Sequence, residues 1–369
     1  MAIYSSTLWQ CDRLRRTNCL AAFVGTAVGM GGMALAEGFA PHNMALKMSG
    51  PFGALATLLY AVPAGQHGTS KNMWGGFAAT TLVVVTMQKL GLVYPWPLPH
   101  LFNLLMMPSV ATAVMHGLGV LHPPASAYAM VYAMVSPVGM LPTVQFCITG
   151  FAWCLWLQAV QLGLALTFSS LQRPSADLAS TGCCADRPAA QEPTVVHVFA
   201  ATLIALGALA AIEQALVVNN LPAVAHLLLG SYAATCALLY AAPAVALGAP
   251  QNTLGGHAIS IGVALVIHYG MHYWHLPVLL EKVMTPAVAT AAMLRFDLLH
   301  PPATATAIIF VMLEEHSHQD VAFVLPTLGA CLVMLLTQYA AQQSSSIAAY
   351  YLCPQPPLVA AQAQARVLV

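Results

Sequence analysis

The sequence predicts an all-α, polytopic transmembrane bundle built from two tandem repeats. The 369-residue chain is 59% hydrophobic and only 6% charged, with a mean hydropathy of +0.76, whereas soluble domains carry about 25% charged residues. Apolar runs that approach the length of about 20 residues needed to cross a bilayer recur in both halves. These runs do not alternate as β-barrel strands do, so we expect helices, which satisfy their own backbone hydrogen bonds in lipid.

The N-terminal segment, residues 1–18, is basic because it carries Arg13, Arg15 and Arg16 just before the first apolar run. Basic residues at the end of a span favour the cytoplasmic side, so we expect this end on the cytoplasmic or stromal side of a membrane. The net charge is zero, and the chain has no long block of one charge. The expected partner is therefore the lipid bilayer, and not a nucleic acid.

Three sequence blocks occur twice in the same order, which indicates a tandem duplication. The blocks are "GPFGALATLLYAVPA" from Gly50 and "GSYAATCALLYAAPA" from Gly230, "NMWGG" from Asn72 and "NTLGG" from Asn252, and "LHPPA" from Leu121 and again from Leu299. We therefore expect a first transmembrane repeat over residues 19–170 and a second over residues 195–343. A polar linker at 171–194 separates them, and a disordered tail occupies 344–369.

Each repeat is expected to contain about five or six hydrophobic segments, some of them short. Residues 50–63, 125–135 and 303–313 are apolar pieces of this kind. At 1.5 Å per residue they are shorter than the roughly 30 Å hydrocarbon core of a bilayer. They are either short spans or re-entrant half-helices.

The His-Pro-Pro block predicts a helix start, because proline is tolerated in the first turn, where its missing N–H costs nothing. His122 and His300 then lie at or just before the N-cap of a short helix in apolar surroundings. Free N–H groups and the positive end of the helix dipole at such a point suit an anion or a polar substrate. The alternative is a structural break in which the histidine caps a backbone carbonyl.

The Asn-x-x-Gly-Gly block suggests a second set of candidate substrate-binding residues. An asparagine before a helix suits an N-cap, and paired glycines allow close backbone approach. The candidates are Asn72, Gly75 and Gly76 in the first half, Asn252, Gly255 and Gly256 in the second, and the cation Lys71, which Gln251 replaces in the second half. The alternative is a turn into a tightly packed helix, with Lys71 at the membrane interface.

Two other sets of titratable residues carry open alternatives. Glu37 and Glu213 are acids near the ends of the first span of each half, suited to proton coupling or to the interface. "HYGMHYWH" places His268, His272 and His275 at a spacing that brings three imidazoles to one helical face. They could bind Zn²⁺ or Cu²⁺, or belong to an interfacial aromatic belt.

Together these blocks resemble the HPP family of integral membrane proteins, named for its His-Pro-Pro motif, over both halves of the chain. The resemblance implies that His122 and His300 are the motif histidines and that the Asn and Gly residues above are the Asn-Gly-Gly block. Family members often carry Arg three residues before His-Pro-Pro, where this chain has Gly119 and Asp297.

Some members of this family are nitrite transporters, so the resemblance implies a multi-pass transporter of a small inorganic anion, with nitrite as the leading candidate. The two His-Pro-Pro half-helices would form a pseudo-symmetric site, and a homo-oligomer is compatible with this pairing. The alternatives are a non-transporting membrane scaffold, or divalent-metal handling by His268, His272 and His275. No catalytic triad, phosphate loop or CxxC pair is present, so we expect neither an enzyme nor a cofactor.

Overall fold

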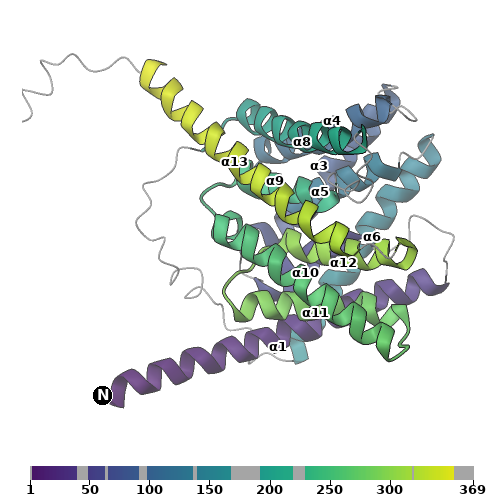
Figure 1. Ribbon diagram of the computed structural model, residues 1–369, viewed down its shortest axis with the longest axis vertical. Coiled ribbons are helices and arrows are strands. Elements are labelled where there is room, and N and C mark those ends of the chain that lie inside the picture. The colour runs from purple at the N-terminus through teal and green to yellow at the C-terminus, as the bar shows by residue number, and fades with distance from the viewer. Residues whose placement is uncertain are drawn as a thin grey trace, which may run out of the picture.

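The computed structural model describes residues 2–39, 49–62, 65–90, 98–135, 139–167, 192–218, 229–317 and 320–352. Within these ranges every regular element is a helix (Figure 1). The predicted all-α class is therefore confirmed. Residues 171–191 of the predicted linker and residues 353–369 of the predicted tail lie outside the described ranges, as do the side chains of the basic segment up to residue 17.

The two halves contain corresponding helices in the same order. The first half contributes α1 (Ala2–Phe39), α2 (Gly50–Ala61), the 3₁₀ turn η2 (Gln66–Gly68), α3 (Ser70–Lys89), α4 (Leu98–Gly117), α5 (Pro123–Val135) and α6 (Met140–Thr167). The second contributes α8 (Val195–Val218), α9 (Gly230–Cys236) continued by the π-helical turn η4 (Ala237–Ala241), the 3₁₀ turn η5 (Ala246–Gly248), α10 (Pro250–Tyr273), α11 (Val278–Arg295), α12 (Pro301–Ser317) and α13 (Asp320–Leu352). The segments α2, α5 and α12 are the short helices that the sequence predicts.

The first helix of each half packs on the other half. α1 makes its most extensive contacts with α11, and α8 makes its most extensive contacts with α4. Figure 1 shows α1 beside α11 at one side of the bundle and α8 beside α4 at the other. Because each half exchanges its first helix in this way, neither half buries its own apolar surface alone.

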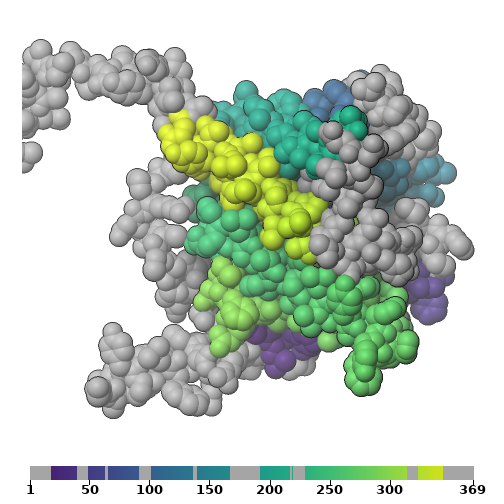
Figure 2. Space-filling model, viewed as in Figure 1, coloured from purple at the N-terminus to yellow at the C-terminus, as the bar shows by residue number. Residues whose placement is uncertain are grey.

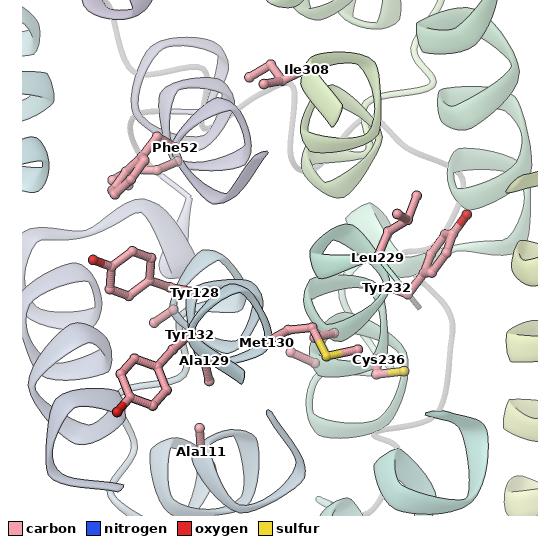
Figure 3. Packing of buried hydrophobic residues seen from close by; sticks show 14 of the residues in the cluster. Phe52, Ala111, Tyr128, Ala129, Met130, Tyr132, Leu229, Tyr232, Cys236 and Ile308 are labelled. Carbon is pink, nitrogen blue, oxygen red and sulfur yellow. The ribbon is translucent and has the colours of Figure 1, made fainter. Parts of the chain in front are cut away.

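Four short segments occupy the centre of the bundle. α2 packs on α12, α5 packs on α9, and α2 also contacts α9, so the two halves meet through the same pair of elements twice. Figure 3 shows these segments, with Phe52 on α2, Tyr128 on α5, Tyr232 on α9 and Ile308 on α12; the rings of Tyr128 and Tyr232 point away from each other. These four side chains are buried.

The distribution of side chains is that of a membrane protein. Large apolar side chains such as Leu35, Leu155, Ile204, Val266 and Leu336 are exposed on the long outer helices, while the buried set is rich in Thr, Ser and His. Figure 2 shows α13, α10 and α11 side by side on one such outer face. This pattern places apolar groups against lipid and polar groups inside.

Five helices within the described residues are long and apolar enough to cross a membrane. They cover Asn18–Phe39, Met140–Leu166, Val195–Leu216, Pro250–Tyr273 and Phe323–Gln343. The chain is therefore an integral membrane protein. α13 continues to Leu352, so residues 344–352 of the predicted tail are helical, because the alanines and glutamines around this point are good helix formers.

Candidate functional site

Each His-Pro-Pro block starts a short helix, as predicted. α5 begins at Pro123 and α12 at Pro301, directly after the histidines. The backbone carbonyls of His122 and His300 each accept a bond from the amide three residues later, both at 2.9 Å. Both imidazoles are fully buried, so each helix N-terminus lies inside the protein beside a polar ring.

The two histidines make the same backbone hydrogen bond. His122 Nδ1 donates to the carbonyl of His67 in η2 at 2.8 Å, and His300 Nδ1 donates to the carbonyl of Leu247 in η5 at 2.7 Å. A carbonyl only accepts, so Nδ1 carries the proton and Nε2 of the neutral ring holds a lone pair. The predicted alternative role, a cap on a backbone carbonyl, is thus present in both halves.

The second glycine of each Gly-Gly pair lies directly against the His-Pro-Pro histidine. A Cβ atom on Gly76 would lie 2.5 Å from the Cβ of His122, and one on Gly256 would lie 2.6 Å from the Cβ of His300. The first glycines, Gly75 and Gly255, meet the side chains just before the motif in the same way. Glycine is required here because the two backbones approach too closely for any side chain.

The two motif asparagines close the loop that precedes their helix. Asn72 Nδ2 donates to the carbonyl of Gln66 at 2.8 Å, and Asn252 Nδ2 donates to that of Ala246 at 2.9 Å. The interpretation of these residues as N-caps is wrong. Thr69 holds the N-cap position of α3 and Ala249 that of α10, so each asparagine lies in the first turn and bonds backward.

Asn72→Ala and Asn252→Ala are each expected to destabilise the protein by about 1 kcal/mol, because each removes the hydrogen bond that closes its loop. The measurement is the thermal midpoint in detergent. Lys71→Ala, which changes the exposed neighbouring residue on the same turn, serves as the control and should leave the midpoint unchanged. Equal midpoints for all three variants would show that the loop bond is dispensable.

The remaining predicted cation, Lys71, is exposed in the first turn of α3. The positions three residues before each His-Pro-Pro block, Gly119 and Asp297, are C-terminal caps. Gly119 (φ +62°) and Asp297 (φ +56°) both adopt the left-handed conformation after α4 and α11. The amides of Val120 and Leu298 bond back to the carbonyls of Met115 and Met293, which is the Schellman pattern.

Two buried histidines next to the motif were not among the predicted site residues. His67 donates from Nδ1 to the carbonyl of Leu121 at 3.2 Å. The ring of His257 in α10 lies 5.0 Å, centroid to centroid, from the ring of His300. The halves differ here, because Leu247 corresponds to His67 and Phe77 corresponds to His257. Each half thus adds one buried histidine from a different element.

The metal alternative does not have the predicted geometry. α10 ends at Tyr273, and His275 follows it with φ +52°, so His275 leaves the helical face shared by His268 and His272. His268 instead lies 2.9 Å from a Glu281 carboxylate oxygen. No group of three metal-ligating side chains is formed among the described residues, so the three-histidine site is wrong.

The model of the HPP transmembrane region matches residues 12–175 and again residues 188–350. The chain belongs to the HPP family. The predicted resemblance is therefore confirmed, and it covers both halves. This double match agrees with the paired helices of the two halves.

Two relatives in Dictyostelium discoideum are each described as a transmembrane protein. One is 32% identical over 111 residues, covering 30% of this chain and 36% of the relative. The other is 32% identical over 113 residues, covering 30% of this chain and 40% of the relative. The matched stretch thus spans well under half of either relative. No solved structure matches the HPP chain significantly.

Both His-Pro-Pro starts lie near the C-terminal end of α2. Ala61 and Val62 at that end pack against the cluster that contains Leu299 and Ala303, and the η2 turn that follows binds His122. The described bonds of each imidazole nevertheless join it to its own half. The two histidines thus lie in two related environments. The prediction that both His-Pro-Pro helices form one pseudo-symmetric site stays a prediction.

Proposed function

We propose that this HPP protein is a transporter of a small inorganic anion, with nitrite as the leading candidate, and that the buried His-Pro-Pro helix starts are its binding elements. The observation that carries the proposal is a fully buried imidazole beside a helix N-terminus in both halves. Such a point offers a polar ring and the positive end of a helix dipole inside a membrane protein, where a polar group without a role is costly. Nitrite rests on the family resemblance alone.

His122→Ala and His300→Ala test this proposal with the purified protein reconstituted into liposomes. Nitrite uptake is expected to fall in at least one of the two variants, because each loses a polar group at the helix start. His272→Ala removes an exposed histidine and should leave uptake unchanged. Uptake at the level of the unaltered protein in both motif variants would contradict the assignment of the site.

A non-transporting scaffold is the second candidate, and the close packing of the motif supports it. Gly76 and Gly256 touch their histidines, and each histidine holds a loop by its Nδ1 bond. A purely structural motif predicts that the same two substitutions lower the thermal midpoint without a specific change in uptake per folded molecule. Measuring both quantities on one preparation separates the candidates.

A further inference from the structure

The surroundings of the two motif histidines differ in polarity. Thr235 and His257 lie beside His300, and Tyr232 and the carbonyl of Thr253 lie beside His257. The corresponding first-half residues are Phe52 for Tyr232, Leu55 for Thr235, Met73 for Thr253 and Phe77 for His257. All four polar side chains of the second half are fully buried. The second half thus replaces four apolar side chains by polar ones at a considerable desolvation cost.

Two of these polar groups have no hydrogen-bond partner among the described residues. They are the Thr253 hydroxyl group and the Nε2 atom of His257, and in the first half the Nε2 atoms of His67 and His122 also have none. Buried polar groups are normally satisfied, so a cluster of unsatisfied ones needs an explanation. A small polar ligand that bonds to them supplies one.

The hydrogen bonds also fix which ring nitrogens carry protons. His257 Nδ1 donates to the carbonyl of Thr253 at 2.8 Å, and His300 Nδ1 donates to that of Leu247. In the neutral rings, both Nε2 atoms therefore present lone pairs, which repel an anion. Binding an anion through these rings requires a proton on Nε2.

Proton and anion then stabilise each other. A single charge in this buried site is strongly destabilised by its loss of hydration. An imidazolium and an anion together have no net charge and can hydrogen-bond to each other. The rings of His257 and His300 are 5.0 Å apart between centroids, and the Thr235 hydroxyl lies 3.3 Å from His300 Nε2. Either ring can hold the added proton while the hydroxyl groups bond to the anion.

The other titratable groups nearby come from neighbouring helices. α9 brings Tyr232, whose ring lies 6.3 Å from that of His257 and which is itself near Glu213 of α8 and Cys331 of α13. α11 faces α10 with Glu281, which is bound to His268 about three turns away from His257. Among these groups, the imidazoles of His257 and His300 are the ones that can accept a proton when an anion binds.

We propose that the second half holds the principal anion site, formed by His257, His300 and the hydroxyl groups around them, and that this site takes up one proton with each anion. This rests on the proposed anion transport and adds its site and its coupling ion. The source of the proton is the surrounding water, which donates it to a neutral Nε2 atom as the anion enters.

The first test uses the full-length protein in detergent, in weakly buffered solution above the ordinary imidazole pKa of about 6.5, with sodium nitrite as the probe. Nitrite addition should raise the pH, because protons are taken up with the anion. His257→Phe, which installs the residue found at position 77, should abolish this uptake and weaken nitrite binding about tenfold or more. A wild-type protein that shows no proton uptake overturns the proposal.

His67→Leu is the matched control, because it installs the residue found at position 247 in the other half. It should keep both nitrite affinity and proton uptake, and a loss of uptake in this variant alone would overturn the assignment to the second half. His257→Gln, which keeps a polar side chain that cannot be protonated in this range, should also lose the uptake; its thermal midpoint separates loss of the site from loss of folding.

Flux measurements distinguish this proposal from the proposed function. If nitrite binds with proton uptake but no flux is seen in liposomes, the transport function is contradicted and the binding site is supported. If nitrite flux persists in a folded His257→Phe protein, the proposed site is contradicted and the transport function is supported.

Discussion

Gly256→Ala is expected to destabilise the protein by about 1–3 kcal/mol, the usual cost of overpacking a dense interior. The added methyl group would lie 2.6 Å from the Cβ of His300 and 3.0 Å from the carbonyl oxygen of Leu298. Neither atom is the end of a flexible side chain, so the contact is relieved only if α10 moves away from the start of α12. The thermal midpoint in detergent measures the effect.

Gly262→Ala on the same helix is the matched control, because a Cβ there meets nothing within 4 Å. This variant should be neutral or gain up to about 1 kcal/mol from the higher helix propensity of alanine. If the two variants shifted the midpoint equally, close packing against His300 would not explain the glycine at position 256.

Local chemistry made the helix starts predictable. Two prolines after a histidine are well suited to a first helical turn and poorly suited to a helix interior, and α5 and α12 begin there. The repeated sequence blocks likewise made the doubled architecture predictable, because similar sequences form similar elements.

The partners of the site residues depend on packing between distant segments, which the sequence pattern does not report. His67 and His257 stand at positions that do not correspond between the halves, so a search for repeated residues passes over both. A search for polar residues that replace apolar ones between the repeats would have found His257 and Tyr232. The exchange of α1 and α8 between the halves has no local signal at all.

The error at His275 has a local cause that the sequence does contain. Pro277 follows two residues later and disfavours the helical conformation in the residue before it. The helix ends, and the amide of Leu276 bonds back to the carbonyl of Met271. Three histidines at helical spacing share a face only where the helix continues through all of them.

Lys282→Met is expected to destabilise the protein by about 3 kcal/mol, because it removes one partner of a largely buried ion pair. Lys282 Nζ on α11 lies 3.2 Å from a Glu37 carboxylate oxygen on α1, and both side chains are mostly buried. The substitution leaves the carboxylate without this cation in an apolar interface. Lys89→Met, at an exposed lysine on α3, should change the free energy of unfolding by less than about 0.5 kcal/mol.

The double variant Lys282→Met/Glu37→Gln should recover much of the lost stability, because the buried carboxylate that lost this cation is then replaced by a neutral amide. A double-mutant cycle on thermal midpoints measures this coupling, and additive single effects would show that the two charges do not interact. In α4 the corresponding position holds Leu104, so the other exchanged contact, between α8 and α4, lacks this cation. A strong coupling would therefore mean that an ion pair fixes the first exchange, while apolar packing forms the second.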